Sequence, residues 1–453
     1  MKLYKNYYKI IFIGISISSM YILIYNFFHY SPILGYDAEA HYSYVDYFSR
    51  YLPRSINLPT RADTREFFSP PIAYIFPSLS QIFCRNLLES NDLLQDCRPI
   101  YGNATQVFQS FLYLVTIYIN LLTLKLFNKS KTIINTSYLL LISLLAVNYR
   151  TISMIRGEIY ILFFLSLFLY FILKIEKSNF TFNLNTPIYL GLIIGSIALS
   201  RQWGFFLFIP VIILLFNKQI LNKAEYLKIW IPSAVLGFVL SGWFYINLYL
   251  QTNSFLAFNM NRTNFSLSNQ PVSFYFPTFE NLQFLFYKPI RPHLDNQFLS
   301  ILYSDLWGDY WGYFSFTSGF LSIGRDQFII GDYFALVNKV SIFTFLIIFI
   351  FYIYSYKKYS SSYLIKYINL ATICSFIGYL IFTISYPVET GDNIKATYII
   401  QGFHLLVFLA SVYFERLKTI NLKTYNILIT LLVLIYINNF QTFLSHFPRN
   451  FYP

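Results

Sequence analysis

"KIIFIGISISSMYILIYNFF", residues 9–28, is the stretch that decides the fold class of this chain. It is almost entirely apolar and long enough to cross a bilayer, which takes about 20 residues in a helix. The composition agrees: 56% of the 453 residues are hydrophobic and 12% are charged, and the mean hydropathy is +0.50. A soluble domain carries about 25% charged residues. The chain is therefore predicted to be an all-α polytopic membrane protein.

Apolar stretches of this kind recur along the chain. The predicted spans, about eleven in number, are 8–28, 105–127, 133–149, 157–174, 186–201, 203–217, 229–250, 337–356, 365–386, 397–414 and 424–440. The first is predicted to be a retained helix rather than a signal peptide, because its core is of full spanning length and no A-x-A site follows. No internal repeat or low-complexity linker is visible, so residues 1–453 are predicted to form one membrane domain.

The distribution of lysine predicts the orientation. With the N-terminus in the cytoplasm, the short inner loops read "LFNKSK", "LKIEKSN", "NKQILNKAEYLK", "YKKYSSSYLIK" and "FERLKTINLK". Each carries at least two cations, as the positive-inside rule requires. Most arginines and acids then fall on the outer side, and arginine binds phosphate or carboxylate through a planar fork. The outer face is predicted to bind anions or to perform chemistry; salt bridges within the outer loops are the alternative.

Two outer segments are long, 29–104 and 251–336, and function is expected where they meet the helix ends. In the first, "GYDAEAHYSYVDYF" (35–48) has helical spacing and predicts an amphipathic interfacial helix. One face would carry Asp37, His41, Tyr44 and Phe48, and another Glu39, Ser43, Asp46 and Arg50. Glu66 and a double proline precede a second stretch, 72–83, which is too short to span and is predicted to be interfacial as well.

Asp37 and Glu39 are about 200° apart on such a helix. Both can reach one site only if Asp37 stays in the turn that Gly35 forms. The alternative interpretation of Asp37 is a helix N-cap.

Several ionisable residues lie at predicted outer helix ends. They are Arg150, Arg156 and Glu158 in "NYRTISMIRGEIY", Arg201 in "SIALSRQWGFF", and Lys395 with Tyr398 in "YPVETGDNIKATYIIQGFH". A charge at the hydrocarbon boundary is costly unless it snorkels, pairs or lines a cavity. Three turns each supply a cation on the same predicted side, so their field would attract a membrane-embedded anion such as a lipid phosphate. Snorkelling to ordinary headgroups is the alternative.

The second outer segment contains "LYSDLWGDYWGYFSF", in which Asp305, Trp307 and Asp309 stand among further aromatic residues. Aromatic faces and carboxylates are a common lining of carbohydrate sites. An interfacial aromatic belt would also explain the aromatic residues, although not the carboxylates between them.

Motifs for other chemistry are absent from the sequence. The five histidines are scattered, and neither H-E-x-x-H nor a Cys/His cluster occurs, so no metal and no cofactor are predicted. Walker A, G-x-S-x-G and Rossmann patterns are absent too, which weighs against an ATPase, a serine hydrolase and a dinucleotide enzyme. No nucleic-acid partner is expected. Cys84 and Cys97 share the first outer segment and can pair if that compartment is oxidising, whereas Cys374 lies in a predicted span.

The chain resembles the GT-C glycosyltransferases, and within them the branch of the protein O-mannosyltransferases and lipid A aminoarabinose transferases. The resemblance is carried by "YDAEAH" (36–41), "EFFSPPIAYIF" (66–76), "IRGEIY" (155–160) and "IKATYIIQ" (394–401). Two departures stand out: Ala38 separates the two acids, and Ser69 stands where a histidine often precedes the double proline. The first leaves open which carboxylate is the base, and the second puts in doubt any role of that histidine.

The resemblance implies a GT-C-like helix bundle that transfers a sugar from a polyprenyl-phosphate donor to a glycan, lipid or protein acceptor. The reaction would take place on the outer face of a bacterial plasma membrane. Asp37 would be the general base, with Glu39 as the alternative, and His41 would orient it or contact the acceptor. Arg156, Arg201 and Lys395 would hold the donor phosphate without a metal, and Glu66 would contact a substrate.

Two other functions fit the same topology. An outer-face polysaccharide polymerase or ligase would also have about eleven helices and outer arginines, but would not need acids just after the first helix. A transporter of lipids or lipid-linked glycans should show paired half-helices or a repeated hydropathy pattern, and the sequence shows neither.

Overall fold

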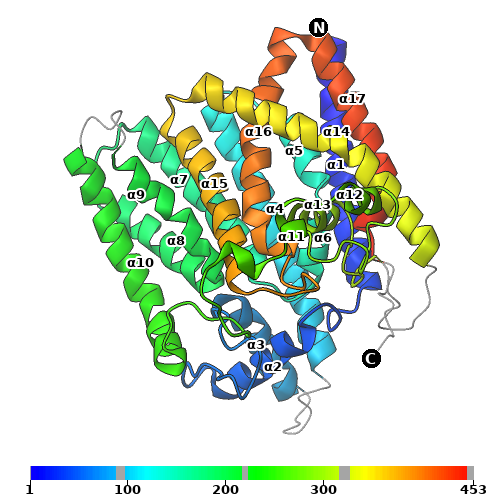
Figure 1. Cartoon of the computed structure of the whole chain (residues 1–453). Helices are drawn as coiled ribbons and strands as arrows, with labels where there is room; N and C mark the ends of the chain where they lie inside the picture. The colour runs from blue at the N-terminus through cyan, green and yellow to red at the C-terminus, as the bar shows by residue number, and fades with distance from the viewer. Residues whose placement is uncertain (1, 88–96, 217–222, 316–326, 446–453) are drawn as a thin grey trace. The chain divides into compact units, whose positions relative to one another are not determined.

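The computed structural model describes residues 2–87, 97–216, 223–315 and 327–445, and these contain helices but no strands (Figure 1). Eight helices are long and apolar enough to cross a membrane in this part of the chain. They are α1 (Lys2–His29), α4 (Arg98–Phe127), α7 (Glu158–Lys177), α10 (Lys223–Thr252), α14 (Gln327–Tyr359), α15 (Tyr363–Ser385), α16 (Ile400–Ile420) and α17 (Leu422–Asn439). Each overlaps a predicted span, which confirms the all-α polytopic class. His446, one of the five scattered histidines, lies outside the described residues.

The other three predicted spans form shorter helices, so the expected count of eleven long helices is corrected to eight for the described chain. Span 133–149 is divided between α5 (Thr136–Ser143) and α6 (Ala146–Ser153). Span 186–201 is α8 (Asn185–Ser200), and span 203–217 becomes the 3-10 helix η1 (Gln202–Leu207) followed by α9 (Ile209–Leu214).

Polar side chains explain the break between α5 and α6. The Asn148 amide donates to the carbonyl of Ile142 at 3.0 Å, and the Tyr149 hydroxyl donates to that of Ser143 at 3.3 Å. These carbonyls belong to the last turn of α5, where the regular i+4 donors are missing, although Ile142 also accepts from the main-chain N–H of Leu145 at 3.3 Å. The buried chain can therefore leave the helix without losing hydrogen bonds, and the apolar run ends early as a helix.

The remaining helices belong to the two long segments between spans. They are α2 (Ala38–Tyr51), α3 (Ile72–Leu87), α11 (Val272–Tyr275), α12 (Phe279–Leu285) and α13 (Phe298–Trp307), with the 3-10 helices η2 (Leu267–Asn269), η4 (Ala396–Ile399) and η5 (Phe440–Phe443). The two helices predicted after the first span, near 37–51 and 72–83, are thus present as α2 and α3.

The chain divides into two compact units, each built from separate stretches of sequence. Unit 1 comprises residues 1–30, 117–150 and 263–453, and unit 2 comprises residues 31–116 and 151–262. The interpretation of residues 1–453 as one membrane domain stays a prediction.

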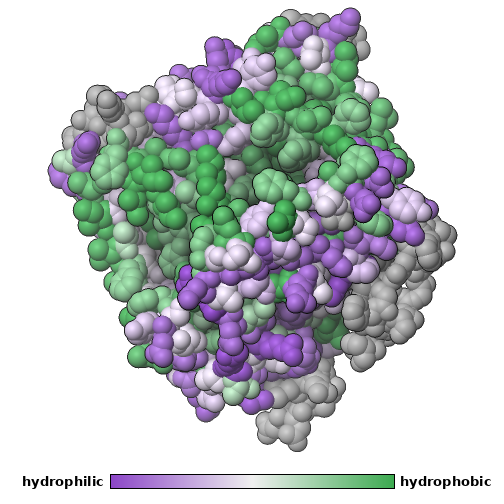
Figure 2. Space-filling view, in the orientation of Figure 1, coloured by the Kyte–Doolittle hydropathy of each residue, from purple (hydrophilic) through white to green (hydrophobic). Residues whose placement is uncertain are grey.

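Unit 2 contains a close helix pair, α8 and α10. A Cβ added to Gly191 would lie 2.7 Å from the Cβ of Leu236, and one added to Gly237 would lie 2.6 Å from Cγ2 of Ile194. Small residues at such crossings let membrane helices approach and pack by van der Waals contact. The outer surfaces of α8, α9 and α10 expose large apolar side chains, among them Leu192, Ile212 and Phe238, and Figure 2 shows hydrophobic side chains gathered over these helices.

Unit 1 is built around α16. The span that contains it is 89% buried, more than any other span in the described chain, and it packs against α5, α14 and α15. Phe351 of α14 stacks on Phe414 of α16 with ring centroids 4.6 Å apart. A helix buried on nearly all sides explains why this apolar stretch includes buried polar residues that bond to neighbouring helices, such as His404, which lies 2.8 Å from Oδ1 of Asn148.

The first long segment is fastened to the start of α4 in unit 2. Cys84 of α3 and Cys97 form a disulfide. Asp46 of α2 accepts hydrogen bonds from Gln81 at 2.6 Å, from Arg98 at 2.6 and 2.8 Å, and from Tyr101 at 3.0 Å. The predicted polar face of α2 therefore includes a buried residue: Asp46 is 6% exposed and holds α2, α3 and α4 together.

Candidate functional site

The turn before α2 has the conformation on which the role of Asp37 depends. Gly35 has a φ of +120°, and a Cβ at this position would lie 2.9 Å from the sulfur of Met154. Asp37 has a φ of 61° and a ψ of 13°, in the left-handed region that side chains rarely adopt. Asp37 occupies the N-cap position of α2, but its side chain makes no capping hydrogen bond to the helix. Asp37 thus stands in the turn before α2, which is the condition under which it and Glu39 could reach one site.

The predicted faces of α2 are seen in the burial of its side chains. His41, Tyr44 and Phe48 are each 1% exposed or less. The Glu39 side chain is 77% exposed and pairs with Arg98 at 2.9 Å. An exposed, paired carboxylate is a weaker base candidate than one in a constrained turn, because a general base needs a defined position relative to the proton that it takes.

His41 joins two buried partners. Its Nε2 lies 2.8 Å from Nη1 of Arg156, and its Nδ1 lies 2.7 Å from the hydroxyl of Tyr74. A guanidinium can only donate, so Nε2 must accept, and the imidazole proton is assigned to Nδ1, which donates to Tyr74. His41 is therefore placed as a neutral ring that links an arginine to a phenol. Burial raises the pKa of Tyr74 well above its ordinary value.

Arg201 lies between two buried carboxylates. Its Nη1 is 3.3 Å from Oε2 of Glu66, and its Nε is 3.1 Å from Oε1 of Glu158. The residue takes an extended conformation (φ −158°, ψ 150°) at the end of α8, which turns its side chain out of the helical register. Glu158 stands in the first turn of α7, where a negative charge is favoured by the helix dipole.

Ser69 completes this arrangement. Its hydroxyl donates to Glu66 and lies within hydrogen-bond distance of Nη1 of Arg201. Arg156 also donates to the main-chain carbonyl of Tyr36, directly before Asp37, and lies over the Tyr36 ring with Cζ 4.5 Å from its centroid.

We call His41, Glu66, Arg156, Glu158 and Arg201 the unit 2 cluster. All five are 5% exposed or less. The two arginines and two glutamates balance in charge, which is how a protein can bury ionised groups. The sequence prediction that these residues belong to one site is consistent with their contacts, and a role in binding substrate stays a prediction.

Other predicted site residues meet in unit 1. Nη2 of Arg150 lies 2.8 Å from Oδ1 of Asp305 and donates to the Asp305 main-chain carbonyl at 2.9 Å. Nη1 donates to the carbonyl of Gly308 at 2.6 Å. The other carboxylate oxygen of Asp305 accepts from the main-chain N–H of Ala396 at 2.7 Å. Burial raises the pKa of Asp305 to about 6, against the opposing charge of Arg150.

Asp309 lies beside this pair and organises its own loop. Its two carboxylate oxygens accept from the main-chain N–H groups of Gly312, Tyr313, Phe314 and Ser315 at 2.7 to 3.3 Å. Trp307 is fully buried, with no exposed face for a sugar ring in this structure. We call Arg150, Asp305 and Asp309 the unit 1 cluster. Its members hold main-chain groups in place, and sugar binding by Asp305, Trp307 and Asp309 stays a prediction.

Lys395 and Tyr398 also belong to unit 1. They are 7% and 6% exposed, and Nζ of Lys395 lies 5.5 Å from the centre of the Tyr398 ring. The main-chain N–H of Lys395 donates to the hydroxyl of Tyr379 at 2.7 Å, and this bond holds the segment that leads into η4. Arg156 and Arg201 lie in unit 2, so the predicted joint grip of the three cations on one phosphate stays a prediction.

Two residues that contact the unit 2 cluster, Tyr74 and Ser69, could hardly be recognised from the sequence. Tyr74 is one of 42 tyrosines, and nothing distinguishes it until its contact with His41 is seen. Ser69 was marked only by its place before Pro70 and Pro71, where its small side chain reaches both Glu66 and Arg201.

The chain is similar in fold to the oligosaccharyltransferase of Archaeoglobus fulgidus, seen in complex with Zn and sulfate and in its apo form. The TM-scores are 0.52 and 0.54 at 13% sequence identity, over 97% and 98% of this chain and 54% and 57% of the other. The chain thus spans about half the length of the protein that it matches. No family model and no curated protein matches the sequence. The likeness shows that the fold is GT-C-like.

Zinc in that neighbour raises the question of whether the residues here fit a metal. The described residues include no group of three or more His, Cys, Asp or Glu side chains that could hold one. Both buried glutamates of unit 2 contact Arg201, and the carboxylate of Asp309 is occupied by four main-chain donors. These side chains do not fit a metal centre.

Proposed function

We propose that the protein is a membrane glycosyltransferase that moves a sugar from a polyprenyl-phosphate donor to an acceptor on the extracytoplasmic face. The observation that carries the proposal is a GT-C-like fold in which the first long segment brings Asp37 beside a buried arginine network. Arg156 links the turn that holds Asp37 to this network, because it hydrogen-bonds both to His41 and to the main-chain carbonyl of Tyr36, directly before Asp37.

In the proposed reaction Asp37 takes the proton of an acceptor hydroxyl. The acceptor oxygen forms a bond to the anomeric carbon, and the bond from that carbon to the phosphate oxygen breaks. The leaving polyprenyl phosphate gains negative charge, which Arg156, Arg201 and Lys395 would stabilise. Glu39 is the alternative base.

The remaining residues would position these groups. Glu66 and Glu158 hold Arg201 from two sides, and His41 holds Arg156, so each arginine would meet the phosphate in a fixed orientation. Tyr398 would line the donor site beside Lys395. Arg150 and Asp305 would support it from within unit 1 through the Ala396 N–H, one residue after Lys395.

The alternative concerns the donor. The neighbour is named an oligosaccharyltransferase, which favours a lipid-linked oligosaccharide as a second candidate donor for this chain. Such a donor would also suit an outer-face polymerase or ligase. The mannosyltransferase and aminoarabinose transferase branch predicts a polyprenyl-phosphate monosaccharide instead. A transporter is the third candidate function. The break between α5 and α6 gives discontinuous helices, as a transporter would have, but the fold likeness to an oligosaccharyltransferase favours glycosyl transfer.

The test is transfer by the purified protein in liposomes, with polyprenyl-phosphate monosaccharides and a polyprenyl-diphosphate oligosaccharide as donors. Release of the polyprenyl carrier is measured for the wild type, Asp37→Asn and Glu39→Gln. We expect turnover of a monophosphate donor and a fall of about 10² to 10⁴-fold for Asp37→Asn only. A folded, fully active Asp37→Asn contradicts the base assignment. Use of the diphosphate donor alone supports the alternative, and carrier movement across the liposome without cleavage supports a transporter.

A further inference from the structure

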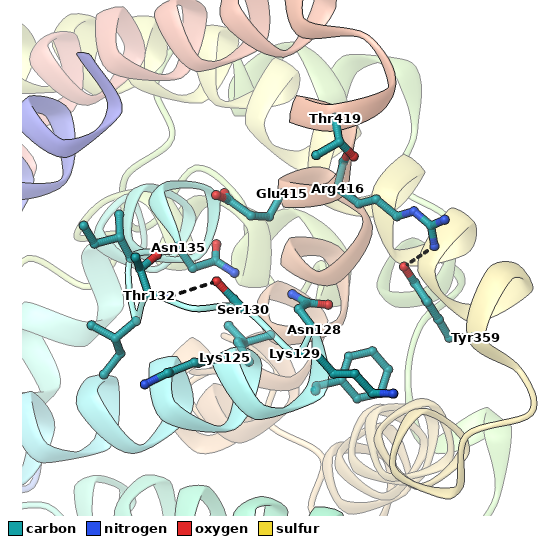
Figure 3. Close-up of a pocket in the computed structure, with 14 residues that line it drawn as sticks. Lys125, Asn128, Lys129, Ser130, Thr132, Asn135, Tyr359, Glu415, Arg416 and Thr419 are labelled. Atoms are coloured by element: carbon teal, nitrogen blue, oxygen red, sulfur yellow. Dashed lines mark hydrogen bonds between the residues drawn. The ribbon is translucent and has the colours of Figure 1, made fainter. Parts of the chain in front are cut away.

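A cavity of about 490 Å³ lies in unit 1, at the C-terminal ends of α4, α14 and α16 (Figure 3). One wall is the end of α4 and the connection to α5, and the opposite wall carries Glu415, Arg416 and Thr419 of α16. The lysine-rich connections here are those that the positive-inside rule assigns to the cytoplasm. The cavity is therefore at the opposite ends of these helices from the predicted outer segments.

The lining carries an excess of positive charge. Lys125, Lys129 and Arg416 line the cavity, and Glu415 is its one acid. In the described part of the chain no acid forms an ion pair with any of the three cations. Unpaired cations that share a cavity attract an anionic group more strongly than isolated surface cations, since their fields add.

The charge of Glu415 is engaged elsewhere. Its Oε2 accepts from the main-chain N–H and hydroxyl of Ser137 at 3.2 and 2.8 Å, and from the hydroxyl of Tyr425 at 2.9 Å. Lys418 lies 3.7 Å from its other oxygen. Glu415 therefore stabilises the first turn of α5 and does not neutralise the cations that line the cavity.

Arg416 is held in position at the wall. Its Nη1 donates to the hydroxyl of Tyr359 at 2.8 Å, and its Cζ lies 5.8 Å from the centre of the Tyr359 ring (Figure 3). The two lysines extend in different directions in this view, on flexible stems that can turn toward a ligand. A fixed guanidinium with two adjustable ammonium groups suits a phosphate with several oxygens.

Apolar side chains complete the lining and indicate the kind of phosphate. Leu124, Phe127, Ile133 and Ile134 stand beside the cations. A free phosphate ion gains nothing from such surface, whereas the glycerol and first acyl carbons of a phospholipid are stabilised by it. We propose that this cavity binds the phosphate headgroup of an anionic phospholipid of the inner leaflet. The proposal does not depend on the proposed glycosyl transfer.

The test is lipid retention, measured by native mass spectrometry on the full chain with added phosphatidylglycerol or phosphatidylcholine. We expect the wild type to retain phosphatidylglycerol preferentially. Each of Lys125→Gln, Lys129→Gln and Arg416→Gln should weaken binding about fivefold, and the triple variant about a hundredfold. Lys131→Gln is the matched control, because it removes a cation from the same connection that does not line the cavity.

Three outcomes would overturn the proposal. The first is a folded triple variant that retains phosphatidylglycerol as the wild type does. The second is equal loss in the Lys131→Gln control, which would mean a diffuse surface effect. The third is displacement of the lipid by millimolar inorganic phosphate, which would make the site one for the free ion. If the triple variant does not fold, Lys129→Gln decides, since Lys129 is exposed and its loss costs no packing.

Discussion

Both buried clusters combine arginines with carboxylates, but the partners of their hydrogen bonds and ion pairs differ. In the unit 1 cluster, Asp309 accepts from four main-chain N–H groups, and Arg150 donates to two main-chain carbonyls. In the unit 2 cluster, Arg201 meets the side chains of Glu66, Glu158 and Ser69. Main-chain contacts fix the path of the chain, whereas side-chain contacts can rearrange around a ligand. Unit 1 thus uses its charges mainly to hold the main chain, and the side-chain contacts of unit 2 support the proposal that its cluster belongs to the catalytic site.

The largest expected effect is loss of stability on breaking the unit 1 cluster. Arg150→Ala leaves Asp305 buried without its cation and leaves two carbonyls unpaired, which should cost about 3–5 kcal/mol. The measurement is thermal unfolding in detergent. Arg291→Ala is the control, because its partner Asp392 is 48% exposed and such pairs contribute about 0–1 kcal/mol. Equal melting temperatures for the two variants would contradict the prediction that the buried Arg150 contacts stabilise the fold more than the exposed Arg291 pair does.

The next largest effect should be a pH dependence of stability caused by Asp305 of the unit 1 cluster. The pKa of Asp305 is about 6 in the folded chain and about 3.8 when unfolded, so its protonation stabilises the fold at low pH. That stabilisation is lost as the pH rises through 6. The Asp305→Asn variant lacks this term, so relative to the wild type it should gain about 2–3 kcal/mol between pH 4 and pH 7. Unfolding is measured across this range, with Asp392→Asn as the control, and parallel curves would contradict the prediction.

Arg201→Lys should show the opposite pattern, with activity affected more than stability. A single ammonium cannot replace Nε at Glu158 and Nη1 at Glu66 together, so we expect carrier release to fall about 10- to 100-fold in kcat/KM. The melting temperature should change little, since the charge is kept. Arg98→Lys is the matched control: Arg98 also bridges two acids in unit 2, Glu39 and Asp46, outside the cluster. If Arg201→Lys lowered the melting temperature but not the activity, the unit 2 cluster would have a structural role instead of a catalytic one.

The smallest effect should come from Gly35→Ala. An alanine would be strained at φ +120° and would meet the Met154 sulfur, which should cost about 1–3 kcal/mol and displace Asp37. We expect a lower kcat together with this modest destabilisation. Gly14→Ala in α1 is the control, because a Cβ there meets nothing within 4 Å. Unchanged turnover by Gly35→Ala would show that the turn does not position the base.

Hydropathy predicted the eight long helices because their apolar runs exceed the spanning length. It failed at 133–149 because Asn148 and Tyr149 satisfy carbonyls that a continuous helix would have used. A polar residue inside an apolar run was the available signal. The division of the chain into two units could not be predicted, because each unit joins stretches that are far apart in sequence.

The candidate site was partly predictable for a related reason. Charges next to apolar runs are rare and costly, so Glu66, Arg156, Glu158 and Arg201 were visible in the sequence. The ion pairs of Arg201 with the two glutamates follow from that cost. Asp46 was placed on a polar face, yet it is buried by Arg98, Gln81 and Tyr101, which come from other helices. Partners from elsewhere in the chain leave no local pattern.

The Cys84–Cys97 disulfide also reports on the biogenesis of the protein. Such bonds persist mainly in oxidising compartments, so we predict that the segment between the first two spans crosses the membrane before the bond closes. The distribution of lysine also predicts that this segment is outside, so two predictions with different physical causes, charge during insertion and thiol oxidation, agree. The disulfide is thus a built-in marker of topology that a membrane-impermeant reductant and thiol label can read in intact cells.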